Sequence, residues 1–199
     1  YAGTITFAAD TLRRVTVDIG LSLIHHGFTK LIIVNGNRIA NFSPLEIAAV
    51  EITNRTGAFV GIADVGMIAK NEVAALTRDK VRGFDHAGEI ETAFALHWAG
   101  GHVAMSEARA GTQHEQAGAS RFDYMMELDP AKNGNAITYA VAPEDYRKSS
   151  GPDGVSADPR SATAEQGRDL VTAIGANLAL FIEETRQRSV TVHTRCLPV

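Results

Sequence analysis

A short run near the middle of the chain concentrates side chains that could do acid–base or metal chemistry. Asp85-His86-Ala87-Gly88-Glu89-Ile90-Glu91 carries one imidazole and three carboxylates, and an apolar segment follows it. If Asp85 caps a helix that starts there, His86 and Glu89 lie three residues apart on one helical face. From such a face both side chains can reach one metal ion, or a substrate and its general base.

A purely structural role explains the same carboxylates. Asp85, Glu89 and Glu91 would all lie near the positive end of the helix dipole, where acidic side chains are favourable. The two small residues Ala87 and Gly88 weaken this explanation, because a helix start with a purely structural role does not need so little side chain there. Spacing alone leaves both interpretations open.

A second polar segment, Asn35 to Asn41, follows the apolar run Lys30–Val34. The run indicates a buried parallel strand, and ligands of an open parallel sheet collect beyond the carboxyl ends of its strands. Asn35, Arg38 and Asn41 are therefore candidate substrate-binding residues, and Arg38 could bind an anion. A simple Asn-Gly-Asn turn with no further role is the alternative.

Other motifs are weaker. His25-His26 precedes Gly27 and suits the negative end of a helix dipole, whereas His114 lies in a loop from which it could enter a site. The sequence contains no glycine-rich phosphate loop, cysteine pair or nucleophile elbow.

The elements that must position these residues alternate along the chain. Asp10 or Thr11 is the expected cap of the first helix and Gly27 its expected stop, with Leu12, Val15, Ile19 and Leu23 as its apolar face. Helices are predicted over residues 11–26, from Ser43-Pro44 to Gly57, over 70–76 and from Thr163 onward, and strands at Lys30–Val34, Ala58–Ile62 and Ala136–Val141. This alternation predicts an α/β fold with a parallel sheet and helices on both faces.

Length and composition fit one globular domain over residues 1–199. The chain is 45% hydrophobic and has a formal net charge of −4, which gives no reason to expect nucleic acid as a partner. The sequence has no apolar run that suits a membrane span. The single cysteine, Cys196, favours a reducing compartment such as the cytoplasm. Because the sequence starts at Tyr1, we expect a processed chain or one piece of a longer protein.

Read together, two of these segments resemble the creatininase (creatinine amidohydrolase) family. They are Val34-Asn35-Gly36 after its strand and the element His86-Ala87-Gly88-Glu89-Ile90-Glu91-Thr92. Residues 2–6 are similar to that family's entry into its first long helix, and residues 154–167 to its loop into the last helix. The four segments occur in the family's order and cover nearly the whole chain.

The resemblance implies a three-layer α/β/α fold with a mostly parallel sheet, in an oligomer. It also implies metal-dependent hydrolysis of a non-peptide C–N bond in a small cyclic amide or formamide, with two divalent ions, Zn or Mn, that share a water. By this analogy Glu89 is a metal ligand, His86 carries a proton to the leaving nitrogen, and Glu91 braces the site. Because both motifs are predicted where strands of one parallel sheet lead into helices, we expect His86 and Glu89 in one pocket at the carboxyl ends of the strands, near Asn37.

The sequence departs from the family pattern at two points. The family's first ligands, a Glu-x-His pair and an Asp, precede the segment at residues 2–6, and this sequence begins too late to include them. The family's Asn-Gly-His turn reads Asn35-Gly36-Asn37 here, so Asn37 is the candidate ligand in place of that His, through oxygen. Another chain of a homo- or hetero-oligomer or a removed segment could supply the missing ligands, or they are lost. In a working hydrolase we expect a companion segment that carries Glu-x-His and Asp to pack beside residues 1–10. The alternative is a non-catalytic binding or assembly subunit, which Asn37 favours.

Overall fold

The structure, a computed structural model, describes residues 5–79, 86–111 and 153–195. The chain divides into two compact units, which we call the sheet unit (Ala2–Ile68 with Ala176–Val199) and the motif unit (Ala69–Gly175). The division does not test the prediction of one domain over residues 1–199. The predicted strand Ala136–Val141 lies outside the described residues.

Two parallel strands form the centre of the sheet unit. β1 (Lys30–Asn35) and β2 (Phe59–Asp64) are joined through the helix α2 (Arg38–Thr56). The strands pair in parallel with Lys30 opposite Phe59 and Asn35 opposite Asp64, so their carboxyl ends lie at the same level. Both strands lie where the apolar runs predicted them, and their parallel pairing is confirmed.

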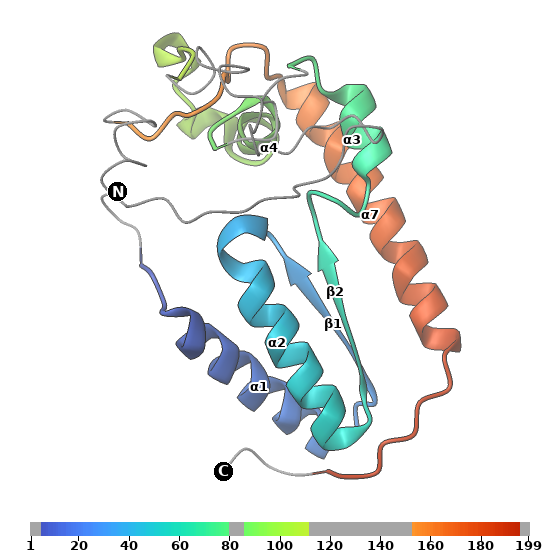
Figure 1. The fold of residues 1–199 in the computed structure, drawn as a ribbon. Helices are drawn as coiled ribbons and strands as arrows, with labels where there is room; N and C mark the ends of the chain where they lie inside the picture. Colours follow the sequence, from blue (N-terminus) through green and yellow to red (C-terminus); the bar gives the residue numbers. More distant parts are fainter. Residues whose placement is uncertain (1–4, 80–85, 112–152, 196–199) are drawn as a thin grey trace, which may run out of the picture. The chain divides into compact units, whose positions relative to one another are not determined.

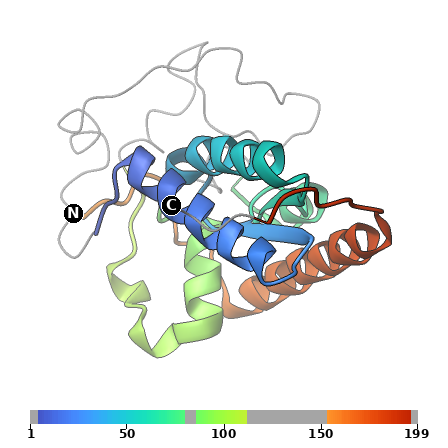
Figure 2. The ribbon, with the colours of Figure 1, turned by 90° about the horizontal axis from the view of Figure 1, so that it is seen from below.

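Helices cover both faces of these strands (Figures 1 and 2). α1 (Ala9–His25) and α2 lie on one face, and the second half of α7 (Ala164–Gln187) lies on the other. The contact between β2 and α7 is close at Gly61, where an added Cβ would lie 2.9 Å from a ring carbon of Phe181. The predicted α/β fold is therefore confirmed.

The core of the sheet unit forms where α1 meets α2. Val17, Leu21 and Ile24 of α1 are buried together with Ala48 and Ile52 of α2. The predicted apolar face of α1 is wrong, because Val15, Ile19 and Leu23 are exposed and Leu12 is half-buried. A Cβ at Gly20 would lie 2.5 Å from Cδ1 of Ile52, so this glycine leaves room for the two helices to approach on the face that is buried.

The first helix begins without the predicted side-chain cap. Its N-cap is Ala8, and Asp10 lies inside the first turn, with a carboxylate oxygen 2.8 Å from Arg13 Nη2. The hydrogen bond from Arg13 holds the pKa of Asp10 below its usual range. The predicted stop is confirmed, since Gly27 follows the helix at φ +104°, a conformation that glycine adopts easily.

The second helix begins at Arg38, earlier than the predicted start at Ser43, and Pro44 lies inside it. The Asn35 side chain accounts for the early start. Its Oδ1 accepts a hydrogen bond from the Asn37 N–H at 3.3 Å, which turns the chain as it leaves β1. The Asn41 N–H then donates to the Asn37 carbonyl at 3.3 Å.

The motif unit contains three helical segments around the His-Ala-Gly-Glu turn. These are α3 (Lys70–Leu76), α4 (Glu89–Ala99) and the first half of α7, with short 3-10 helices η1 (Gly100–His102) and η2 (Met105–Glu107) after α4. Thr163 caps α7 as predicted, because its Oγ1 accepts the Gln166 N–H at 3.1 Å. Across the described ranges, no helix combines the length and apolar character that crossing a membrane requires.

Candidate functional site

The turn that carries His86 precedes α4 instead of forming part of it. Gly88 is the N-cap of this helix, so the predicted helix start at Asp85, which itself lies outside the described residues, is wrong. The predicted shared face of His86 and Glu89 is wrong for the same reason. Ala87 has φ +53°, a left-handed conformation that interrupts a helical path between the two residues. Glu89 is fully buried, whereas about half of the His86 side chain is exposed.

Glu91 reaches back from the first turn of α4 to the turn before it. Its Oε2 accepts the Ala87 N–H at 2.7 Å and lies 3.5 Å from His86 Nδ1. A glutamate at the third helical position commonly accepts the N–H of the N-cap residue, whereas Glu91 accepts that of the residue before the N-cap. A carboxylate beside Nδ1 favours the tautomer that carries its proton there, which leaves the proton-accepting lone pair on Nε2.

The Glu89 carboxylate is held inside the motif unit by three N–H groups. The backbone N–H of Arg78 lies 2.9 Å from Oε2, that of Asp79 lies 2.6 Å from Oε2, and Gln166 Nε2 lies 2.5 Å from Oε1. The carboxylate thereby fixes the segment after α3 and the start of α7 to the first turn of α4. Gln166 does not complete the predicted capping box with Thr163, because its side chain donates to Glu89 and to the Leu76 carbonyl.

The loop before α7 holds the His86 backbone. Ser156 and Ala157 both donate hydrogen bonds to the His86 carbonyl. They belong to the segment 154–167, so two of the four segments that carry the family resemblance meet at this turn. Sequence reasoning did not identify Ser156, although its place in that segment was a usable signal.

In the sheet unit, the carboxyl ends of the two strands carry a buried polar pair. Asn35 Nδ2 lies 3.2 Å from Asp64 Oδ2, and the Gly66 N–H donates to Asp64 Oδ1 at 3.1 Å. Both side chains are buried. Asp64 was not predicted, although Asn35 was, and the parallel register that pairs them was the signal available.

A cavity of about 300 Å³ opens beside Asp64, between α2, β2 and the second half of α7. Phe42, Met67 and Phe181 line it with apolar surface. Of the residues predicted to bind substrate here, Asn35 contacts Asp64 and Asn41 is half-buried in α2. Arg38 is the first residue of α2, and its side chain lies outside what the structure describes. Their substrate-binding role stays a prediction.

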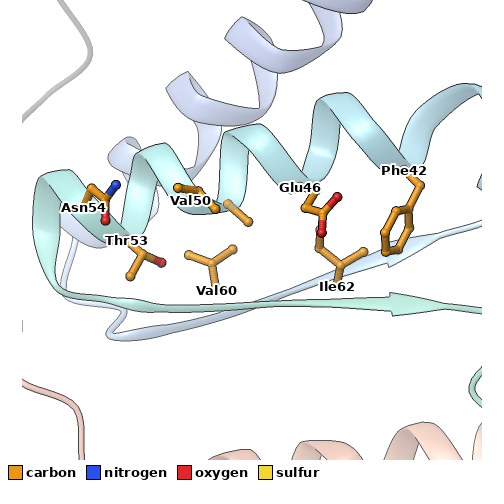
Figure 3. Close-up of a pocket in the computed structure, with 8 residues that line it drawn as sticks. Phe42, Glu46, Val50, Thr53, Asn54, Val60 and Ile62 are labelled. Atoms are coloured by element: carbon orange, nitrogen blue, oxygen red, sulfur yellow. The ribbon is translucent and has the colours of Figure 1, made fainter.

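A second hollow, of about 380 Å³, runs between α2 and β2 (Figure 3). Its walls include Phe42, Val50, Val60 and Ile62, and Glu46 is a carboxylate at its side. No residue predicted from the sequence to act in catalysis or binding lines this groove.

Among the side chains that the structure describes, no three of His, Cys, Asp or Glu converge so as to hold a metal ion. Asn37 is exposed in the sheet unit, whereas His86 and Glu89 belong to the motif unit. A shared pocket for the three residues therefore stays a prediction. His114 and Cys196 lie outside the described ranges.

Comparison with known proteins gives one family and several solved structures. The sequence profile of a family described as Creatininase: Creatinine amidohydrolase matches residues 1–182. A structure described as creatininase with Mn matches 94% of this chain and 68% of its own, with a TM-score of 0.66 and 18% identity. A crystal structure of creatinine amidohydrolase (creatininase) covers 95% of this chain and 68% of its own chain, with a TM-score of 0.67 and 18% identity.

A third similar structure is a creatininase mutant described as the Zn-Zn type. It covers 94% of this chain and 68% of its own, with a TM-score of 0.65 and 18% identity. These likenesses establish the fold. No curated protein sequence matches this chain.

Proposed function

Because this chain belongs to the creatininase family, we propose that it is a metal-dependent amidohydrolase acting on a non-peptide C–N bond. The substrate class is a small cyclic amide or formamide. The observation that carries the proposal is the distance of 3.5 Å between His86 Nδ1 and Glu91 Oε2, in the segment on which the family resemblance rests.

In the proposed reaction, His86 moves the proton. Hydrolysis adds water to the carbonyl carbon and breaks the bond to nitrogen, so one proton must pass from the attacking water to the leaving nitrogen. An imidazole can take that proton and then release it, and a neighbouring carboxylate stabilises the charged form between the two steps. Glu91 is that carboxylate. The half-exposed position of the His86 side chain suits exchange with a bound substrate.

The family's similar structures include forms named for Mn and for Zn, which supports a divalent ion as the cofactor. The side chains that the structure describes do not by themselves fit such an ion. Glu89 and Asn37 remain the proposed ligands from this sequence, and the others must come from residues outside the described ranges or from another chain. A bound divalent ion would supply an activated water.

We further propose that the protein acts in the cytoplasm as a homo- or hetero-oligomer. Val15, Ile19 and Leu23 lie one helical turn apart along α1 and are exposed, which supports a surface for association. Light scattering at micromolar concentration tests this assembly. A monomer that retains full activity would contradict it.

The catalytic proposal is tested by the histidine variants His86→Gln and His102→Gln. The protein, with every chain that co-purifies, is supplied with Zn or Mn and assayed on small cyclic amides and formamides. We expect His86→Gln to lower kcat by about 10²- to 10⁴-fold, the usual contribution of a general acid–base group. His102→Gln makes the same chemical change at an exposed position of η1 and should leave kcat unchanged. Equal activity in both variants would refute the assignment of His86.

A second function, a non-catalytic binding or assembly subunit, is favoured by one observation. The Glu89 carboxylate is already engaged by three N–H donors of its own unit, which suits a structural role. Metal content of the purified protein, measured with its co-purifying chains, separates the two functions. Absence of both metal and turnover supports the binding subunit, and stoichiometric metal supports the hydrolase.

A further inference from the structure

The peptide group between His86 and Ala87 is held at both of its ends. Its carbonyl oxygen accepts three hydrogen bonds, from Ser156 Oγ at 3.0 Å, from the Ser156 N–H at 3.1 Å and from the Ala157 N–H at 3.3 Å. Its N–H donates to Glu91 Oε2 at 2.7 Å. One peptide plane therefore joins the loop before α7 to the first turn of α4.

This peptide sits next to an unfavourable backbone conformation. Ala87 has φ +53°, a backbone angle that residues other than glycine seldom adopt unless surrounding contacts stabilise it. The plane of the peptide fixes ψ of His86 and φ of Ala87, the two angles on either side of it. The hydrogen bonds at its two ends thus oppose relaxation of Ala87 and set the direction in which the His86 side chain leaves the backbone.

The donor segment is itself anchored. Ser156 is buried, and the carbonyl of the next residue, Ala157, accepts the Gly111 N–H at 2.8 Å. Gly111 lies so close to this segment that an added Cβ would be 2.2 Å from the Val155 carbonyl oxygen. The Ser156 hydroxyl therefore reaches the His86 carbonyl from a backbone that is packed on its other side.

We propose that Ser156 is a positioning residue for His86, acting through the hydrogen bond from its hydroxyl to the His86 carbonyl. The proposal deepens the proposed function and rests on it, because the imidazole that Ser156 orients is the proposed proton carrier. Loss of this donor leaves the two backbone N–H groups on the carbonyl. It should therefore loosen the turn without abolishing it.

The experiment compares Ser156→Ala with Ser161→Ala in the full chain with its co-purifying partners. Ser161 lies in the same loop and contacts Arg78 through its backbone carbonyl, so loss of its hydroxyl is a matched control. The ring signals of His86, identified by their loss in His86→Gln, are followed by NMR. We expect shifted or broadened His86 signals in Ser156→Ala and unchanged signals in Ser161→Ala.

Kinetics add a second readout. Ser156→Ala should lower kcat by about tenfold with little change in KM, because a misplaced proton carrier weakens the chemical step more than binding. Unchanged His86 signals would overturn the proposal whatever the activity. Shifted signals with no activity in any variant, including the parent, would support the positioning role and count against the proposed hydrolase.

A further variant covers the case in which Ser156→Ala does not fold. Ser156→Cys has a slightly larger side chain and replaces the hydroxyl by a weak donor. Its His86 signals should be shifted from those of the parent. Signals identical to the parent would contradict the role of the hydroxyl.

Discussion

Asn35 and Asp64 stand opposite each other at the carboxyl ends of two parallel strands, with the Asn35 amide nitrogen 3.2 Å from the Asp64 carboxylate. Neither side chain belongs to the core of apolar residues between α1 and α2. Each is nevertheless buried, so their hydrogen bonds replace the water that these groups would otherwise contact. The pair ties the ends of β1 and β2 beside the cavity lined by Phe42 and Phe181.

Asp64→Ala should destabilise the protein through this pair. The substitution leaves the Asn35 amide and the Gly66 N–H without their acceptors, at an expected cost of about 2–4 kcal/mol in the free energy of unfolding. Urea denaturation measures the change. Asp18→Ala, at an exposed position of α1, is the control and should change stability by less than about 0.5 kcal/mol. Equal effects of the two variants would show that the buried pair contributes nothing.

Substitution of Glu89 should affect folding more than that of its neighbour Glu91. Glu89→Ala removes the acceptor of two backbone N–H groups and one side-chain amide, all close to the buried carboxylate, so we expect a loss of about 3 kcal/mol or more. Glu91→Ala, at an exposed carboxylate, should cost about 1 kcal/mol. Thermal and urea unfolding give both values.

The Glu89 variants also bear on its predicted role as a metal ligand. Glu89→Gln keeps an oxygen acceptor but loses the charge, so a folded variant can be analysed for Zn and Mn. Loss of metal from the folded variant would support ligation by Glu89. Full metal content together with reduced stability would leave Glu89 with the structural role alone.

Glu91→Gln should separate the two contacts that Glu91 makes. An amide oxygen can still accept the Ala87 N–H, but the neutral side chain no longer stabilises a charged imidazole. We expect kcat to fall by about 10- to 100-fold, with stability within about 0.5 kcal/mol of the parent. Glu107→Gln, at an exposed position of η2, is the matched control. A variant as active as this control would exclude electrostatic support from Glu91.

Two glycines of α7 offer a paired test of how closely α4 and α7 pack. A Cβ at Gly167 would lie 2.0 Å from the Ala93 carbonyl oxygen, whereas a Cβ at Gly175 would meet nothing within 4 Å. Gly167→Ala should therefore lower stability by about 2 kcal/mol or more, because the two helices must separate. Gly175→Ala should raise it by about 0.5–1 kcal/mol through better helix propensity. Denaturant midpoints with opposite signs of change are the expected result.

Elements marked by special residues could be predicted from the sequence. The apolar runs predicted β1 and β2, Gly27 predicted the end of the first helix, and Thr163 predicted the start of the last one. These signals are local, since a strand's composition or a glycine at positive φ is independent of distant residues. The family was likewise predicted from short segments, and the profile match over residues 1–182 confirms it.

Predictions failed where a distant contact decided between local alternatives. α1 carries apolar residues on more than one face, and the buried face is the one that meets α2 at Gly20 and Ile52. The start of α4 depends on Ala87, whose left-handed conformation is supported by hydrogen bonds from the loop at Ser156. Neither contact is visible in a local pattern.

Asp64 was missed for a similar reason. A single aspartate after an apolar run has no recognisable motif, and its importance appears only when the register sets it beside Asn35. Glu89 was predicted as a site residue, but its burial was not, because its three donors come from segments before and after it in the chain. The sequence indicated which carboxylates share a motif, but not which of them the fold buries.

The hydrogen bond between Ser156 and His86 also has a consequence for the order of folding. It joins residues 70 apart in sequence, whereas Asn35 and Asp64 are 29 apart. Closing the longer loop costs more chain entropy, so this contact should form after the transition state. Stopped-flow measurements on Ser156→Ala should then show faster unfolding at an almost unchanged folding rate. The turn that carries the proposed proton carrier would then acquire its shape later than the paired ends of β1 and β2, and would lose it earlier on unfolding.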